Sequence, residues 1–195
     1  MRARLENFLQ QTWYGDRKPG FVQLLLERVY RLLFSVNKIL KSRRIAQDLK
    51  GKPIIVVGNL NAGGAGKTPM VIRLCGMAKA MGLEPGVVSR GYGRRSSGPL
   101  RVTPDLRPAD TGDEPFLIAT RARVPVQVDS DREDAVRALF ADGVDLVIAD
   151  DGLQRHSLPR SLEICLFDRE RGFGNGHLLP AGPLREPTTR LESVD

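Results

Sequence analysis

Residues 54–69, IIVVGNLNAGGAGKTP, constrain the fold of this chain more than any other segment. Residues 54–57 are apolar and lead into Gly58, which is typical of a short buried strand. A glycine-rich turn follows, and the apolar-periodic run from Met70 to Met81 predicts a helix. Strand, glycine loop and helix in this order predict a phosphate-binding loop. We therefore expect an α/β fold of the P-loop NTPase type, with a mostly parallel sheet flanked by helices.

The residues of this loop suit phosphate chemistry. Small residues let backbone N–H groups approach phosphate oxygens, and the helix N-terminus adds partial positive charge. Lys67 can reach the phosphates, and the Thr68 hydroxyl can hold Mg²⁺. Asn61 replaces the usual first glycine, and asparagine can form the turn because it tolerates left-handed backbone angles. A glycine-rich turn that precedes a lysine by chance is the alternative, but it does not account for the flanking strand and helix.

Composition narrows the class of protein. The 195 residues are 41% hydrophobic and 27% charged, which predicts one sizeable globular domain. Cys75 and Cys165 lie in apolar periodic segments, so we interpret them as buried small residues rather than a disulfide. Two histidines without a CxxC or HExxH motif argue against a zinc site. No signal peptide is predicted, because no small-residue cleavage site follows an apolar core.

The formal charge of +7 is concentrated at the N-terminus. Residues 1–52 carry twelve Lys or Arg and four Asp or Glu, a net of +8, whereas the remainder has eighteen basic and nineteen acidic residues, a net of −1. We therefore divide the chain into a basic arm, residues 1–52, and a P-loop core, residues 53–195. A basic arm suits anionic lipid or nucleic acid. The aromatic residues are few and not interleaved with the basic ones, which disfavours nucleic acid.

Residues 21–40 predict an N-terminal amphipathic helix. Its apolar face consists of Val22, Leu25, Leu26, Val29, Leu33, Val36 and Leu40. Charges within the segment argue against a transmembrane span. Two interpretations stay open: a helix packed on the domain, or an interfacial helix lying in a membrane surface. In the second, anionic headgroups would contact Lys41, Arg43, Arg44, Lys50 and Lys52.

Polar residues follow two further predicted strands, where ligands bind in open α/β sheets. Residues 85–89 lead into Arg90-Gly91-Tyr92-Gly93-Arg94-Arg95, whose arginines can bind phosphates, although a solvated basic loop would look the same. Residues 144–149 lead into Asp150-Asp151-Gly152. Downstream of a phosphate loop, a carboxylate pair at such a strand end is typical of the second magnesium-binding motif, the alternative being a polar loop.

The other predicted elements complete an alternating α/β pattern. They are a loop over residues 96–112, a helix over 116–121, a strand over 124–128, a helix capped by Asp129 or Ser130 and running to about Ala141, a strand over 162–167, and a Gly- and Pro-rich functional loop after Asp168.

Five motifs together resemble one family over nearly the whole chain. They are GNLNAGGAGKTP, SRGYGRR, TGDEP, DDGLQ and GNGHLLPAGPLREP, and they occur in this order in the tetraacyldisaccharide 4′-kinases, the lipid A 4′-kinases of Gram-negative bacteria. The resemblance implies transfer of the ATP γ-phosphate to the 4′-hydroxyl of tetraacyldisaccharide 1-phosphate, forming lipid IVA. It implies peripheral binding to the anionic cytoplasmic face of the inner membrane, with the lipid A precursor as partner and no obligate protein partner.

The resemblance also implies roles for single residues. ATP would be bound by Asn61, Ala62, Gly63, Gly64, Ala65, Gly66, Lys67 and Thr68. Mg²⁺ would be held by Thr68, Asp150 and Asp151, with Glu186 as a further metal-site residue. Asp113 of TGDEP matches the family's proposed catalytic carboxylate and would act with Lys67. His156 lies one position later than the histidine that members place directly after DDGLQ, and members continue past Asp195 with a C-terminal part that supplies a histidine partner for the aspartate.

The rival interpretation is a membrane-associated ATPase switch of the partitioning or iron-protein type, which also uses a GGxGKT loop. Those proteins place a second lysine just before the two glycines. Ala62 occupies that position here, which disfavours the switch.

Overall fold

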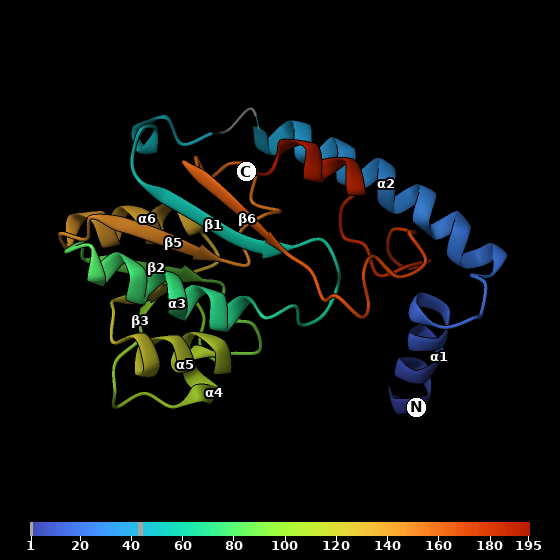
Figure 1. The fold of residues 1–195 in the computed structure, drawn as a ribbon, viewed down its shortest axis with the longest axis horizontal. Coiled ribbons are helices and arrows are strands. Elements are labelled where there is room, and N and C mark those ends of the chain that lie inside the picture. Colours follow the sequence, from blue (N-terminus) through green and yellow to red (C-terminus); the bar gives the residue numbers. More distant parts are fainter. Residues whose placement is uncertain (1, 43–44) are drawn as a thin grey trace.

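A six-stranded sheet forms the centre of the computed structural model, which describes residues 2–42 and 45–195 (Figure 1). The strand order is β3-β4-β2-β5-β1-β6. The strands are β1 (Ile54–Asn59), β2 (Pro85–Ser89), β3 (Leu100–Arg101), β4 (Val126–Val128), β5 (Leu146–Asp150) and β6 (Leu162–Leu166). Every described pairing is parallel except that of β3 with β4, so the mostly parallel P-loop type sheet is confirmed.

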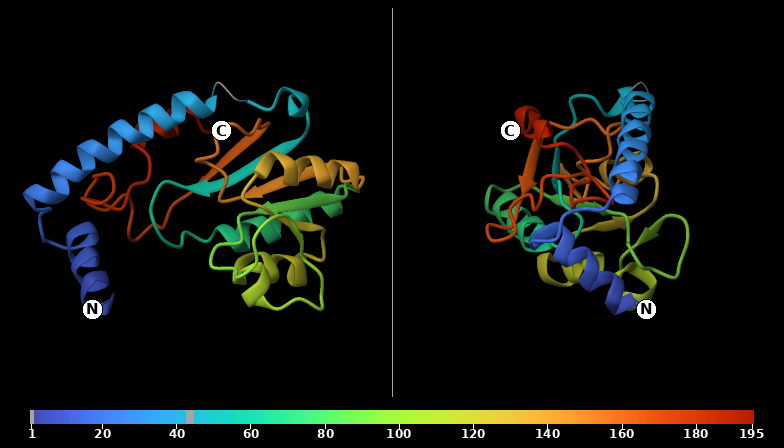
Figure 2. Two further views of the ribbon diagram at one scale, coloured as in Figure 1. Left: turned by 180° about the vertical axis from the view of Figure 1, so that it is seen from behind. Right: turned by 90° about the vertical axis from the view of Figure 1, so that its right-hand side faces the viewer.

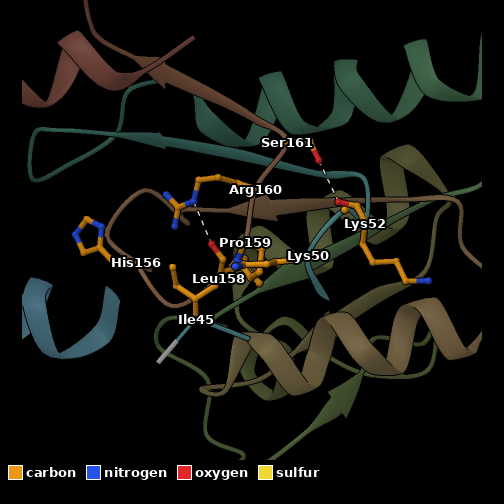
Figure 3. Close-up of a pocket in the computed structure, with 9 residues that line it drawn as sticks. Ile45, Lys50, Lys52, His156, Leu158, Pro159, Arg160 and Ser161 are labelled. Atoms are coloured by element: carbon orange, nitrogen blue, oxygen red, sulfur yellow. Dashed lines mark hydrogen bonds between the residues drawn. The ribbon is translucent and has the colours of Figure 1, made fainter. Parts of the chain in front are cut away.

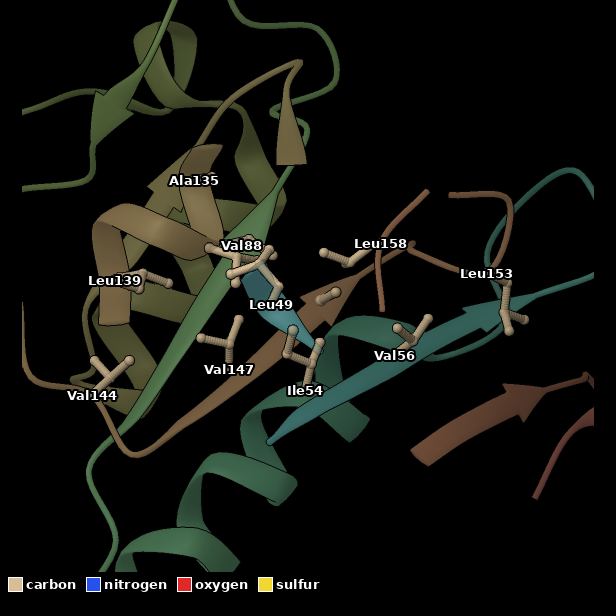
Figure 4. Packing of buried hydrophobic residues seen from close by; sticks show 12 residues of the cluster. Leu49, Ile54, Val56, Val88, Ala135, Leu139, Val144, Val147, Leu153 and Leu158 are labelled. Atoms are coloured by element: carbon tan, nitrogen blue, oxygen red, sulfur yellow. The ribbon is translucent and has the colours of Figure 1, made fainter. Parts of the chain in front are cut away.

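Helices cover both faces of the sheet, which is why its central strands are apolar on both sides. On one face, α3 (Lys67–Ala80) and α5 (Asp113–Ala122) pack on side chains that include Val57. On the other face, α6 (Arg132–Ala141) packs on a cluster that includes Val56, the residue just before Val57 in β1 (Figure 4). Adjacent β1 residues therefore serve opposite layers, as the period of two in a strand requires.

The N-terminal helices lie beside the C-terminal part of the chain rather than on the strands. α2 (Phe21–Ser42) runs along the loops that follow β6, and α1 (Arg2–Tyr14) meets them near its C-terminal end, where Trp13 O accepts from Asn175 N (Figures 1 and 2). Short elements complete the fold: η1 (Gln47–Leu49), α4 (Pro108–Thr111) and η2 (Thr188–Ser193). No helix within residues 2–42 and 45–195 is both long and apolar enough to cross a membrane. Arg43 and Arg44, expected to meet headgroups, lie outside the described residues.

Several predicted boundaries differ from the structure. α3 begins at Lys67 and α5 at Asp113, each three residues before the predicted start, because the glycine turns lead directly into the helices. The N-cap of α6 is Asp131, so the prediction of Asp129 or Ser130 was wrong: Asp131 accepts hydrogen bonds from two backbone N–H groups of the first turn. α1, β3 and α4 were not predicted.

The two cysteines are unpaired, as expected. Cys75 is buried, whereas Cys165 is only half-buried, so its predicted burial was overstated. Burial raises the pKa of Cys75 to about 11. The division of the chain at residue 52 stays a prediction.

Candidate functional site

The glycine-rich loop between β1 and α3 has the backbone that a phosphate site requires. Gly63 and Gly66 have φ angles of 115° and 77°, which L side chains rarely adopt. Gly66 is the N-cap of α3, so the first N–H groups of that helix face the loop. These features are what a site for anionic oxygens requires.

Asn61 does not act as the left-handed residue that the sequence suggested. Within the described ranges, the non-glycine residues with positive φ are Arg123 and Asp151. Asn61 instead forms an antiparallel bridge with Leu184, and its side-chain amide donates to Gly172 O at 2.8 Å. The expected backbone role was therefore wrong, and Asn61 joins the loop to the C-terminal segment.

Lys67 points back over the end of β1. Its Nζ donates to Asn59 Oδ1 at 3.0 Å and lies 3.6 Å from Asp151 Oδ1. Its side chain is 10% exposed. The expected phosphate-binding lysine and one of the expected metal carboxylates thus lie together, at the carboxyl ends of the adjacent strands β1 and β5.

Asp150 ends β5 as an almost completely buried carboxylate. Its Oδ2 accepts from Ser89 Oγ at 3.2 Å, while Oδ1 has no hydrogen-bond partner among the described residues. Burial, together with the charges of Glu114 and Asp151, raises its pKa to about 6. A buried carboxylate oxygen without a hydrogen-bond partner fits a cation ligand.

The pKa of Asp151 is shifted in the opposite direction from that of Asp150. Burial alone would raise its pKa, but hydrogen bonds from Arg185 and the charges of Arg185 and Lys67 hold the pKa below its ordinary value. It is therefore ionised at neutral pH.

The sequence predicts Thr68, Asp150 and Asp151 as ligands of Mg²⁺, and a hydroxyl and carboxylates are donor types that Mg²⁺ accepts in phosphate-loop proteins. Thr68 lies in the first turn of α3, and its role and those of the two aspartates as metal ligands stay predictions. Within residues 2–42 and 45–195, no group of three or more His, Cys, Asp or Glu side chains could hold a metal by itself. Mg²⁺ usually takes one or two carboxylates and completes its shell with water and substrate phosphates.

Glu186 lies in a different environment from the aspartate pair. It is completely buried and accepts from Gln154 Nε2 at 2.8 Å. Its Oε2 lies 3.8 Å from His156 Nε2 and 3.7 Å from Arg190 Nε. Burial raises its pKa. These contacts give Glu186 a place beside the site, and its role as a metal ligand stays a prediction.

Asp113 is exposed at the start of α5. The N-cap is Gly112, with φ of 93°, so Asp113 is the first helical residue and not the cap. Glu114, the next residue, is close enough to contribute to the raised pKa of Asp150, so this helix start lies near the aspartate pair. Glu114 was not singled out from the sequence.

The RGYGRR loop packs directly on this helix start. A Cβ on Gly91 would lie 2.8 Å from Thr111 O, and a Cβ on Gly112 would lie 3.1 Å from Tyr92 O. Arg94 uses its guanidinium within the loop, where Nη2 donates to Gly98 O at 2.6 Å. The loop therefore positions TGDEP, and Arg90 is the arginine of this segment that faces a pocket.

A pocket of about 350 Å³ adjoins the aspartate pair, with Arg132 almost completely buried in its wall. The Nε atoms of Arg132, Arg155 and Arg185 are buried without hydrogen-bond partners in the described part of the chain. The full lining is Tyr30, Lys41, Arg90, Ser130, Arg132, Asp151, Gln154, Arg155 and Arg185. Its strong cationic excess suits a phosphate group, and the sequence pattern pointed only to Arg90.

A second hollow, of about 320 Å³, lies at the opposite ends of the strands (Figure 3). There Ser161, just before β6, donates to Lys52 O at 3.0 Å, just before β1. His156 reaches this hollow, and its pKa is lowered to about 4 by burial and by neighbouring cations. The strands β1 and β6 begin at this hollow, because parallel strands place their N-terminal ends together, whereas the phosphate loop follows the other end of β1.

The family model described as "Tetraacyldisaccharide-1-P 4'-kinase" matches residues 21–195. Curated tetraacyldisaccharide 4′-kinases of Pseudomonas paraeruginosa and Methylobacillus flagellatus are 46% and 42% identical, and the matches cover 96% and 100% of this chain. The chain spans 57% and 59% of the lengths of these two relatives.

A solved structure agrees with these sequence matches. The crystal structure of LpxK from Aquifex aeolicus in complex with ATP superimposes with a TM-score of 0.77 at 32% identity. The match covers 88% of this chain and 56% of the other.

Proposed function

The chain belongs to the tetraacyldisaccharide 4′-kinase family, and from this premise we propose that it transfers the ATP γ-phosphate to the 4′-hydroxyl of tetraacyldisaccharide 1-phosphate, forming lipid IVA. The observation that carries the proposal is the meeting of Lys67, Asp150 and Asp151 at the carboxyl ends of β1 and β5, beside a cation-lined pocket. A nucleotide and a phosphorylated acceptor need adjacent anion sites, and this arrangement supplies both.

On the nucleotide side, the loop N–H groups and Lys67 would bind the phosphates. Thr68, Asp150 and Asp151 would hold Mg²⁺, which supplies charge neutralisation for the transferring phosphoryl group. Asp150 binds a cation best after it loses its proton, and its raised pKa still lies below neutral pH. Arg185 keeps Asp151 ionised and correctly oriented.

On the acceptor side, Asp113 would accept or orient the proton of the attacking hydroxyl. Its exposure at the start of α5, next to Glu114, supports this role. Arg90, Arg132 and Arg155 would bind a phosphate of the acceptor, because guanidinium groups form paired hydrogen bonds with phosphate oxygens. The partitioning-type ATPase switch has no comparable need for an acceptor pocket.

The orientation of α2 supports peripheral binding at the cytoplasmic face of the inner membrane. The stripe predicted to be apolar is exposed: Val22 is 66% and Leu33 is 63% accessible. The other exposed large apolar side chains of the helix are Phe21, Leu25, Leu26, Val29, Leu32, Val36, Ile39 and Leu40. The helix packs on the protein through its opposite face, so a membrane interface is the partner that its apolar face fits. Basic residues of the arm would add attraction to anionic headgroups.

A direct assay tests the proposed reaction. The chain is incubated with γ-labelled ATP, Mg²⁺ and tetraacyldisaccharide 1-phosphate in detergent micelles, and the lipid is examined for label. Labelled lipid that depends on Mg²⁺ and acceptor supports the kinase. Release of inorganic phosphate at the same rate with and without acceptor, and no labelled lipid, would favour the ATPase switch instead.

A further inference from the structure

The inward face of α2 carries three residues at helical spacing, Glu27, Tyr30 and Phe34, and each contacts a segment that leads to the phosphate loop. Glu27 is the most unusual of them, because it is a carboxylate that is only 5% exposed. Its Oε1 accepts from Leu178 N at 3.1 Å, and its Oε2 lies 2.8 Å from His177 Nδ1. Arg31 completes the set with a bond of 3.0 Å to Oε1.

The segment fixed by Glu27, which we call the 177–186 loop, is bonded directly to the phosphate loop. Leu178 forms a bridge with Leu184, and Leu184 forms one with Asn61. Ala62 N donates to Pro183 O at 2.7 Å. Backbone hydrogen bonds therefore join the first half of the phosphate loop to the 177–186 loop, which α2 fixes.

Tyr30 supplies a second route. Its hydroxyl donates to Arg185 O at 2.9 Å, and Arg185 N donates to Leu60 O at 2.6 Å. The guanidinium of Arg185 continues to Asn59 O, at 2.9 Å from Nη2. Arg185 is thus the single residue that connects the Tyr30 hydroxyl to Asn59, the last residue of β1.

Phe34 supplies a third route, through side chains. Its ring meets His156 edge-on with centroids 6.1 Å apart, and His156 lies beside Glu186. Gln154 then connects Glu186 to Asn59, with Nε2 at 2.8 Å from Glu186 Oε1 and 3.2 Å from Asn59 O.

Two of these routes meet at Asn59, which is 1% exposed. Its Oδ1 accepts from Lys67, and its Nδ2 donates to Asn61 O at 2.9 Å and Gly63 O at 3.3 Å. Asn59 therefore orders both the lysine and the turn of the phosphate loop.

We propose that Glu27 and Tyr30 are positioning residues of the nucleotide site: through the 177–186 loop they hold Asn59 and Ala62, and so pre-order the phosphate loop. A glycine-rich loop has many conformations to lose on binding phosphate, and contacts that remove them beforehand raise affinity. The same helix, α2, would then bind the membrane surface with one face and order the ATP site with the other. The inference rests on the proposed function only in taking ATP as the ligand.

The experiment uses the whole chain without lipid and compares Tyr30→Phe, Glu27→Gln and Glu27→Ala with wild type. Hydrogen–deuterium exchange is followed at Ala62 and Arg185, and Mg²⁺–ATP affinity is measured by calorimetry. Ser35→Ala is the matched hydroxyl deletion, since Ser35 bonds within α2 to Arg31 O, and Glu84→Gln is the matched charge deletion on an exposed residue. Vesicle sedimentation is measured in parallel.

We expect faster exchange at Ala62 and Arg185, and ATP binding weakened about 3- to 10-fold by Tyr30→Phe, which is the usual effect of one lost hydrogen bond. Glu27→Ala should weaken it further, and Glu27→Gln should recover part of the loss because its amide oxygen can still accept from Leu178 N. Vesicle binding and both controls should match wild type.

Unchanged exchange at Ala62 and unchanged ATP affinity in folded Tyr30→Phe and Glu27→Ala would overturn the proposal. A uniform rise in exchange at core amides such as Ile148 would also overturn it, because it would mark a loss of global stability. If the wild-type chain does not bind ATP, the proposed function fails, while the exchange at Ala62 still decides whether α2 orders the loop.

Discussion

Arg185 and Asp151 form a two-point ion pair, with Nη1–Oδ2 at 3.0 Å and Nη2–Oδ1 at 2.9 Å. The pair joins LREP to the carboxylate motif at the end of β5, 34 residues apart in the chain. The ion pair keeps Asp151 ionised and beside Lys67. The backbone of Asp151 has a φ of 50°, which is unusual for a residue other than glycine. The arginine thus fixes the orientation of the carboxylate for which we propose a metal-binding role.

Replacing Arg185 by lysine should lower stability, because a lysine provides a point charge and loses the paired geometry. Both side chains are partly exposed, so we expect a loss of about 1 kcal/mol after solvent screening, or roughly 2–4 °C in Tm. Asp151 has a lowered pKa in the folded state, so this stabilisation is present above its ordinary pKa of 3.8 and is lost as the pH falls below it. Thermal melts of both proteins at pH 7 and pH 3 measure the difference, and an equal gap at the two pH values would contradict the assignment.

Lys67→Ala should abolish ATP-dependent phosphorylation without unfolding the chain. The substitution removes the charge that we propose for the phosphates, whereas Asp151 keeps Arg185 as its partner. A lipid phosphorylation assay and a thermal melt of the same preparation are the measurements. Turnover at the wild-type rate would remove Lys67 from the mechanism.

Asp113→Asn should lower kcat by roughly 10²- to 10⁴-fold, the usual effect of losing a general base. ATP affinity and Tm should stay near wild type, because Gly112 is the N-cap of α5 and the helix does not depend on an Asp113 cap. Steady-state kinetics and ATP calorimetry separate the two effects. A kcat near that of wild type would leave the acceptor-side base unassigned.

His156 should make stability depend on pH. Burial lowers its pKa to about 4, from 6.5 in the unfolded chain, so the unfolded state binds more protons between these values. Above pH 6.5 the neutral His156 costs the folded state nothing. As the pH falls from 6.5 to 4, the free energy of unfolding decreases by up to about 3 kcal/mol because of this residue. Glu186, whose pKa burial raises, acts in the opposite direction, so each pH requires its own comparison.

Urea unfolding of wild type and His156→Gln at pH 7.5 and pH 5 provides that comparison. The variant should lose less stability than wild type on acidification. Parallel loss in the two proteins would show that His156 does not titrate in this window.

Serine at both Leu32 and Leu33 should reduce vesicle binding by at least 10-fold, since burying each leucine stabilises by roughly 1.5–3 kcal/mol. Binding should require anionic lipid and weaken with salt, because charges are screened within roughly 10 Å at 0.1 M. Liposome sedimentation measures this, with Met81→Ser, a 76% exposed residue at the end of α3, as the control. Equal pelleting of all three proteins would exclude α2 as the membrane contact.

The local motifs of the sequence determined the core of this fold. Strand, glycine turn and Lys67-Thr68 are contiguous, and the apolar run before Asp150 fits a central buried strand. Periodicity and chain order therefore sufficed to predict a parallel sheet with a phosphate site at one edge. The aspartate pair followed from the same logic, because parallel strands bring their carboxyl ends together.

Tertiary structure decided what lies around that core. Periodicity showed that α2 has an apolar stripe, but not that the stripe faces outward while Glu27 and Tyr30 face the protein. Nor could the sequence pair Arg185 with Asp151 or bring Arg132 and Arg155 to one pocket. The spacing of a motif fixes only neighbours along one helix, strand or turn, whereas these contacts join residues tens of positions apart and exist only because of how the elements pack.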